Sequence, residues 1–244
     1  MKVSRRGVLA GAAVGGGLVV AWYLMPQRFD APLEPVEGEA GFNAWLKIAD
    51  DGVITVAVPQ CEMGQGVTTL LPQIVAMELG ADWRQIAVEP SPPAGAYANT
   101  VLASHWASLW LAGSADIANE PDSLLARRFA ERTRFNATAA GTTLAAYELP
   151  AREAAATARA MLIEEAAERW GIAPEECRAA DGFVVAGDRQ LRFAELAEGA
   201  ATRDPPAVPP LSSEPPAEPP TGAGSTAQTD FPRLDLPAKV DGSY

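Results

Sequence analysis

The feature that most constrains the fold is a hairpin pattern that leads directly into a helical pattern. Two runs rich in β-forming residues, 44–48 and 53–58, flank the turn sequence Asp50-Asp51-Gly52, which is typical of an antiparallel hairpin. Residues 68–79 then carry apolar side chains at helical spacing, and Gly80 follows as a signal for the end of a helix. Strands joined so closely to an amphipathic helix predict an α+β domain.

The rest of the chain extends this pattern. We predict a short strand at 86–88, a second helix from Pro150 to Gly171, and a small β unit within 181–193. Residues 91–119 show no clear period and are predicted to form a long loop over the core. Pro72 is expected in the first turn of its helix, where the missing N–H has no partner to lose. The element order predicts a mixed sheet with packed helices and no internal repeat.

The composition of the chain excludes several classes of function. The 244 residues include 48% hydrophobic residues, which is enough to bury a core. The net charge of -12, from 31 acidic and 19 basic residues, excludes a general nucleic-acid binder, because binding phosphates needs a basic face. Two cysteines and one histidine exclude a four-thiolate zinc site, a multi-histidine metal centre and an iron–sulfur cluster held by this chain alone.

Residues 1–28 have the features of an export signal or a membrane anchor. Arg5 and Arg6 precede an uncharged stretch, 7–27, that is about the ~20 residues needed to span a membrane. This resembles a bacterial twin-arginine export signal. Bulky residues around Trp22 leave no clear cleavage site, so an inner-membrane anchor with the domain on the periplasmic side is favoured over a cleaved signal. A buried N-terminal helix is the alternative, which five glycines in the first 17 residues disfavour.

The remaining boundaries follow from proline and charge. We predict a linker at 29–41, the main folded domain at 42–203, a proline-rich linker at 204–229 and the start of a further domain at 230–244. Eight of the seventeen residues in 204–220 are proline, so this stretch is expected to be extended, mostly as polyproline II.

The motif most able to carry chemistry is Glu62-Met63-Gly64-Gln65-Gly66, between the second strand and the first helix. The two glycines let the backbone approach a ligand closely, and the Gln65 amide can donate and accept hydrogen bonds. The hydroxyl groups and free N–H groups of the next turn are expected to form an anion site at the helix N-terminus. Taken alone, such a turn is more often only a turn.

Segments on both sides of this motif follow one order along the chain. They are Phe42-Asn43-Ala44-Trp45, Val58-Pro59, the motif itself with Thr69, Leu71–Leu79, Ala140-Gly141-Thr142-Thr143 and Phe231–Gly242. In this order they resemble the N-terminal part of the molybdopterin-binding large subunit of isoquinoline oxidoreductase-type molybdenum hydroxylases, in the xanthine dehydrogenase and aldehyde oxidase superfamily. The resemblance covers nearly everything from residue 42 onward and is strongest at 42–79.

The resemblance implies a molybdopterin cytosine dinucleotide cofactor and either hydroxylation of N-heteroaromatic rings or oxidation of aldehydes, with oxygen from water. By position it implies that Gly64, Gln65 and Gly66 contact the cofactor, with Thr142 and Thr143 as secondary contacts. Gln65 would bind the pterin or an apical ligand of the metal. The implied partners are the remainder of the large subunit and a small [2Fe–2S] subunit.

The chain also departs from the family pattern. The family's catalytic glutamate lies in a Gly-Glu loop near the far end of a much longer subunit, and Gly38-Glu39 matches only its letters. We therefore expect a fragment or split half of the subunit, with part of the cofactor site and no catalytic residue. The alternative is a membrane-anchored envelope module, with a vestigial cofactor site and a proline-rich tail that binds a partner.

Other reactive or bulky residues are expected to have structural roles. Cys61 is predicted to be a buried inert thiol, with a disulfide to Cys177 left open. His105 is predicted to be a hydrogen-bonded loop residue. Four tryptophans are predicted to be core or subunit-contact anchors: Trp45, Trp83, Trp106 and Trp110.

Overall fold

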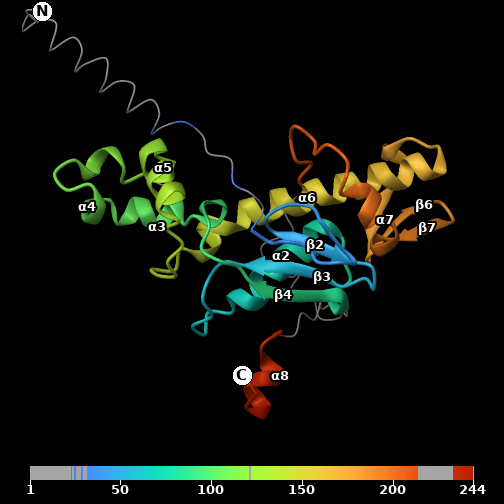
Figure 1. Ribbon diagram of the computed structural model, residues 1–244, viewed down its shortest axis with the longest axis horizontal. Helices are drawn as coiled ribbons and strands as arrows, with labels where there is room; N and C mark the ends of the chain where they lie inside the picture. The colour runs from blue at the N-terminus through green and yellow to red at the C-terminus, as the bar shows by residue number, and fades with distance from the viewer. Residues whose placement is uncertain are drawn as a thin grey trace, which may run out of the picture. The chain divides into compact units, whose positions relative to one another are not determined.

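The computed structural model describes residues 23, 25, 29, 32–120, 122–213 and 233–243. They fall into two compact units (Figure 1). The sheet unit comprises Ala31–Pro92 and Thr143–Tyr244, and the helical unit comprises Pro93–Thr142 together with Met1–Asp30. Every predicted strand lies in the sheet unit, whereas most of the predicted long loop lies in the helical unit.

A four-stranded sheet with the order β1-β2-β3-β4 organises the sheet unit. Its strands are β1 (Glu39–Gly41), β2 (Leu46–Ala49), β3 (Ile54–Val58) and β4 (Ile86–Pro90). The first two pairings are antiparallel, and β3 pairs in parallel with β4, with Ile54 opposite Ile86. The predicted hairpin, the short strand and the mixed sheet are therefore confirmed.

The fold begins earlier than residue 42, because β1 lies within the range predicted as a linker. Leu33 is already buried, and Glu39 pairs with Ala49 of β2. The turn after β1 is held by Asn43, whose side chain accepts the N–H groups of Trp45 and Leu46. A three-residue strand is too short to show the alternation by which strands are recognised in a sequence.

Two long helices pack together in the sheet unit. Each contains a proline in its interior, whereas the sequence predicted both prolines at the start of a helix. Helix α2 (Val67–Leu79) links β3 to β4 and packs against α6 (Thr143–Trp170). Pro72 lies beyond the first turn of α2, and α6 passes through Pro150 instead of starting after it. Each proline removes one backbone hydrogen bond, so burial of the helices' apolar faces must offset that loss.

A second, antiparallel sheet completes the predicted small β unit. It contains β5 (Arg178–Ala180), β6 (Phe183–Ala186) and β7 (Arg189–Arg192), and leads into α7 (Phe193–Ala200). Helix α7 packs against α6 and β2. The 3₁₀ helices η1 (Trp83–Gln85) and η4 (Pro174–Glu176) and the short helix α8 (Leu236–Asp241) are the other helical elements described in this unit.

Gly80 ends α2, lies against β5 of the second sheet and should tolerate no side chain. Its φ is +77°, and an added Cβ would lie 2.8 Å from the backbone oxygen of Ala179. Gly171 has a similar φ of +66° with open space around it. We expect Gly80→Ala to lower the free energy of unfolding by about 1–3 kcal/mol more than Gly171→Ala, because only the first adds a steric clash to the backbone strain. Denaturant unfolding of both variants measures this, and equal losses would contradict the close approach.

The helical unit contains helices where a long loop was predicted. They are η2 (Gly95–Tyr97), α3 (Thr100–His105), α4 (Ala107–Trp110) and η3 (Ala115–Ile117). Helix α5 (Leu124–Thr133) follows the predicted loop, in a stretch for which no element was predicted. The side chain of Asn99 caps α3 by accepting the Leu102 N–H. Helices of three to six residues within 91–119 are too short to display a helical period, which is why the sequence pattern missed them.

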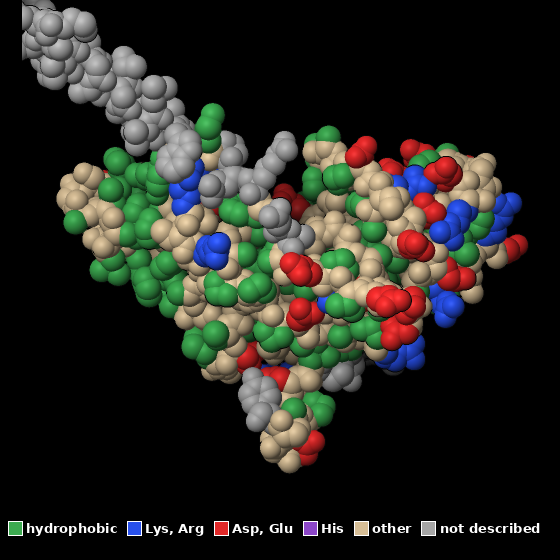
Figure 2. Space-filling view, in the orientation of Figure 1, with side chains coloured by type: hydrophobic (Ala, Val, Ile, Leu, Met, Phe, Trp, Pro, Cys, Tyr) green, Lys and Arg blue, Asp and Glu red, His purple; other side chains and the backbone are tan. Residues whose placement is uncertain are grey.

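Aromatic rings hold the helical unit together. Trp110 stacks on Phe129 with ring centroids 4.1 Å apart, and Phe135 lies against both Phe129 and Trp106. Apolar side chains also gather on the surface over this unit (Figure 2), including Leu109, which is 75% exposed. In the sheet unit Trp45 is buried and meets Tyr147 edge to face. Trp45 and Trp110 therefore act as core anchors, as predicted.

Both ends of the chain are only partly described. Residues 204–213 form neither helix nor strand, and the rest of the predicted proline-rich linker lies outside the described residues. The predicted signal or anchor at 1–28 also lies outside them, except for positions 23 and 25. Among the helices that are described, none has the length and apolar character needed to cross a membrane.

Candidate functional site

The glycine motif forms an open loop between β3 and α2. Gly64 and Gly66 have φ values of +100° and +83°, in the region that favours glycine. A Cβ added to either residue would meet no other atom within 4 Å. The backbone conformation therefore favours glycine at both positions, and the space beside them is open to an approaching group.

The carboxylate of Glu62 occupies the donors that were expected to be free. Its Oε1 accepts the N–H groups of Gly64 at 2.7 Å and Gly66 at 3.0 Å. Its Oε2 accepts the N–H of Thr68 at 3.3 Å and the hydroxyl of Thr68 at 3.1 Å. The predicted anion site at the start of α2 is thus filled by an anion of the chain itself, which corrects the expectation of free donors.

Glu62 is held in its charged form. Burial alone would raise the pKa of this carboxyl, since its side chain is only 4% exposed. The hydrogen bonds from Gly66, Thr68 and Gly64 outweigh burial and lower the pKa. At neutral pH the ionised carboxylate of Glu62 is therefore the acceptor that these loop donors bind.

Gln65 braces the loop with its side-chain amide. The amide oxygen accepts the Met63 N–H at 2.5 Å, and the amide nitrogen donates to the Cys61 carbonyl at 2.7 Å. Both bonds lie at the exposed surface of the loop. In the part of the chain that the structure describes, no acceptor contacts the backbone N–H groups of Gln65 and Val67. Val67 is fully buried, so the N–H of the exposed Gln65 is the one of these two donors that remains available to a ligand.

The two threonines predicted as secondary contacts have different surroundings. The hydroxyl of Thr143 donates to the amide oxygen of Gln60, and the amide nitrogen of Gln60 donates to the Tyr147 hydroxyl, both at 3.3 Å. Thr143 is thereby linked to the segment that enters the glycine loop. Thr142 is buried in the helical unit, where its hydroxyl accepts from Asn99 at 2.9 Å and donates to the Ala139 carbonyl.

A segment near the C-terminus also reaches the glycine loop. The N–H of Leu234 donates to the Thr69 hydroxyl at 3.1 Å, and the guanidinium of Arg233 lies 3.7 Å from the Glu62 carboxylate. Asp235 pairs with Arg233 and Lys239, and these hydrogen bonds hold its pKa far below the usual range. No local pattern in the sequence could have indicated this contact, because it joins residues more than 160 positions apart.

The remaining candidates do not add to the site. Cys61 is exposed rather than buried, because it precedes the loop at its open side, and Cys61 and Cys177, both within the described residues, form no disulfide. His105 is an exposed residue at the end of α3. Among the described residues, no group of three or more histidine, cysteine, aspartate or glutamate side chains could hold a metal ion.

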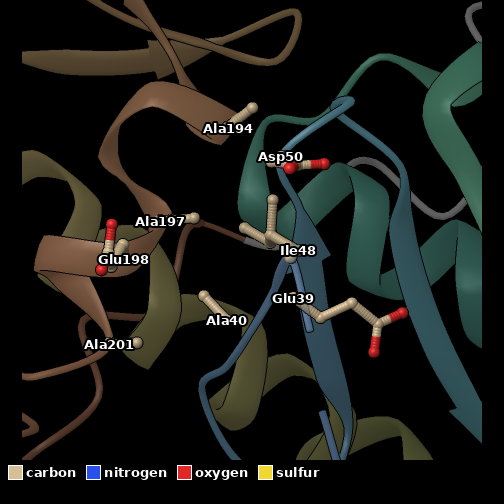
Figure 3. A pocket seen from close by; sticks show the side chains of 9 residues that line it. Glu39, Ala40, Ile48, Asp50, Ala194, Ala197, Glu198 and Ala201 are labelled. Carbon is tan, nitrogen blue, oxygen red and sulfur yellow. The ribbon is translucent and has the colours of Figure 1, made fainter. Parts of the chain in front are cut away.

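A pocket of about 380 Å³ lies elsewhere in the sheet unit. Alanines of α7 line one side, and residues of β1 and β2, with Ile48 among them, line the other (Figure 3). Its acidic side chains include Glu39, which is paired with Lys47 at 2.9 Å. None of the lining residues belongs to the glycine loop.

Comparison with known proteins gives a family for this arrangement. Residues 3–113 match the family described as the molybdopterin cofactor-binding domain. The chain is 26% identical to a protein of Gluconacetobacter polyoxogenes named membrane-bound aldehyde dehydrogenase (pyrroloquinoline-quinone), over 99% of this chain and 27% of that protein. It is 29% identical to the beta subunit of isoquinoline 1-oxidoreductase from Brevundimonas diminuta, over 99% of this chain and 31% of that protein.

A third similarity covers less of the chain. One of the subunits of nicotinate dehydrogenase from Pseudomonas putida is 31% identical over 68% of this chain and 11% of its own length. The chain thus spans less than a third of the length of the curated relatives it matches. The family match over residues 3–113 and these similarities support a molybdopterin cofactor-binding domain of the superfamily that includes the isoquinoline oxidoreductases.

Proposed function

We propose that this chain contributes part of the molybdopterin site of a molybdenum-dependent oxidoreductase, which hydroxylates N-heteroaromatic compounds or oxidises aldehydes with oxygen from water. The observation that carries the proposal is the glycine loop at the start of α2. It leaves open space beside Gly64 and Gly66, and it lies within the segment that matches the family. The names of the relatives support both substrate classes.

The residues present fit a flat heterocycle beside the loop. Gly64 and Gly66 would allow it close to the backbone, and the N–H of the exposed Gln65 would bind its polar edge. We propose Thr142 and Thr143 as secondary contacts. We propose the cytosine dinucleotide form of the cofactor. When bound, its molybdenum centre supplies the two-electron oxidation and the transfer of oxygen from water.

The other parts of the enzyme would come from partners. The catalytic base and the specificity loops would belong to the remainder of the large subunit. Electrons would leave through a small [2Fe–2S] protein, since two cysteines in this chain cannot supply the four ligands of such a cluster.

Gln65 and Gly66 provide the test of this function. In the complete, co-expressed enzyme we expect Gln65→Ala to lower molybdenum content and turnover while the protein stays folded, since its bonds lie at the surface. Gly66→Val should abolish loading, because its side chain fills the open space and opposes the positive φ. Molybdenum content and melting temperature are measured for both, with the exposed Gln190→Ala as the matched control.

Two outcomes would contradict this function. If Gln65→Ala keeps full molybdenum content and turnover, Gln65 is only a brace of the loop. If the complete wild-type enzyme holds no molybdenum, the alternative of an envelope interaction module with a vestigial site gains support.

We propose further that the chain is exported and anchored at the periplasmic face of the inner membrane. The paired arginines and the uncharged stretch at 7–27 support this. With Arg5→Lys and Arg6→Lys together, a fused reporter that folds before export should stay in the cytoplasm. The matched control replaces Arg127 and Arg134, outside the signal, in the same way. A double variant that still delivers the reporter to the periplasm would refute twin-arginine export.

A further inference from the structure

We propose that Glu62 is a positioning residue whose carboxylate acts as an internal ligand of the glycine loop. It holds the backbone of residues 63–68 in the conformation that a cofactor would meet. The role toward a cofactor rests on the proposed function, whereas the hydrogen bonding of Glu62 within the loop concerns this chain alone.

The contacts of Glu62 use both of its oxygens fully. One oxygen accepts two N–H groups from Gly64 and Gly66, and the other accepts the N–H and the hydroxyl of Thr68. Backbone N–H groups that converge on a carboxylate form strong, charge-assisted hydrogen bonds. With the side chain 4% exposed, its removal would leave three N–H groups and one hydroxyl without this acceptor.

This arrangement has a consequence for the chemistry of the ligand. A phosphate placed on the loop would have to displace Glu62 or lie against its negative charge. The donor that stays available, the N–H of the exposed Gln65, suits an uncharged polar edge. The guanidinium of Arg233 lies 3.7 Å from the carboxylate, and its side chain is 41% exposed. Such a pair is weak, so the N–H groups rather than Arg233 account for the position of Glu62.

Hydrogen exchange in the cofactor-free chain tests the internal ligand directly. In full-length protein carrying Glu62→Ala, we expect the amides of Gly64, Gly66 and Thr68 to exchange at least about tenfold faster than in wild type. Amides of β2 and β3 should be unchanged. Glu62→Gln keeps one oxygen and the shape of the side chain, so it should give an intermediate result and serves if the alanine variant does not fold. The exposed Glu175→Ala is the matched control.

Formate provides a readout that a general loss of packing would not change. It is a carboxylate small enough to replace the missing group, so it should slow exchange at the same three amides in Glu62→Ala. Chloride at equal ionic strength should not, and neither salt should affect wild type or Glu175→Ala. Inorganic phosphate in place of formate should protect these amides only in Glu62→Ala, because the wild-type donors are filled. Unchanged exchange in both Glu62 variants, or no protection by formate, would overturn the proposal.

Cofactor loading separates this inference from the proposed function. In the complete enzyme, Glu62→Gln should lower molybdenum content more than Glu175→Ala at equal amounts of folded protein. If formate protects the loop of Glu62→Ala while the wild-type enzyme contains no molybdenum, the internal ligand stands and the proposed function fails. If formate gives no protection while Gln65→Ala loses molybdenum, the proposed function stands and the internal ligand fails.

Discussion

Replacing Glu78 with alanine is expected to lower the free energy of unfolding by about 3–5 kcal/mol, because the change leaves the buried Arg152 and the partly buried Arg159 without their anion. Glu78 lies on α2 and its side chain is 3% exposed. Its carboxylate contacts Arg152 at 3.0 Å and Arg159 at 2.8 Å, both from α6. The pair of arginines and the carboxylate thus join the two packed helices.

The same network fixes the segment that follows α7. The N–H of Ser212 donates to the Glu78 carboxylate at 2.7 Å, and Arg152 donates to the Ser212 carbonyl at 2.8 Å. Arg159 donates to the Pro210 carbonyl and to the Ser212 hydroxyl. Loss of Glu78 should therefore also make the chain near residue 212 more sensitive to proteolysis, whereas the α2 backbone stays helical.

Denaturant unfolding measures the effect, with Glu148→Ala as the matched control. Glu148 lines the same small pocket as Glu78 but is exposed and makes no described ion pair, so its loss should change stability by less than about 0.5 kcal/mol. Equal effects of the two substitutions would contradict the network.

The stabilisation by Glu78 should also depend on pH. Burial raises the pKa of its carboxyl, but the hydrogen bonds from Ser212 and the two arginines outweigh burial and lower it. A carboxyl with a lowered pKa in the folded state contributes stability above its unfolded pKa and loses it as pH falls through the folded value. The difference between wild type and Glu78→Gln should therefore be constant near neutral pH and shrink below about pH 4. A difference that does not change on acidification would argue against a charged Glu78.

The second large effect is expected for Leu71→Ala, at about 2–5 kcal/mol. Leu71 is fully buried on α2, the helix that packs against both α6 and β3. Truncation removes apolar contacts and leaves a cavity that the surrounding elements can close only in part. The melting temperature and the unfolding free energy should both fall while the far-ultraviolet spectrum keeps its helical character.

Leu70 is the matched control, because it is the neighbouring leucine on the same helix and is 36% exposed. Leu70→Ala should cost less than about 1 kcal/mol, since alanine is a good helix former and little buried surface is lost. A cost at position 70 equal to that at position 71 would mean that the buried face of α2 is wrongly placed.

Local patterns in the sequence were sufficient for most elements of the sheet unit. The Asp50-Asp51-Gly52 turn between β-rich runs indicates β2 and β3, and the apolar spacing of 68–79 indicates most of α2. Such patterns work because each element buries one face, and the spacing of its apolar residues records that face. The sequence also predicted a glycine loop between β3 and α2, and the structure adds the positive φ of Gly64 and Gly66.

Other features depended on contacts that no local pattern records. Strand β1 exists because β2 offers it a partner, and α6 continues through Pro150 because packing against α2 offsets the lost hydrogen bond. The short helices of the helical unit are held by Asn99 and by the ring stack of Trp110 on Phe129. These elements are too short or too irregular to be recognised by their period.

The sequence by itself determined which loop we propose as a cofactor contact, because its glycines permit a close approach of the backbone and the flanking segments follow the order of the family. Only the tertiary structure decided how that loop is held. It turned the side chain of Glu62 back onto the donors of Gly64, Gly66 and Thr68, and it brought Arg233 and Leu234 to the start of α2. The physical reason is that N–H groups at the start of a helix have no partner within the helix. Which acceptor reaches them depends on the conformation of the folded backbone, and the contacts of Arg233 and Leu234 join segments far apart in the sequence.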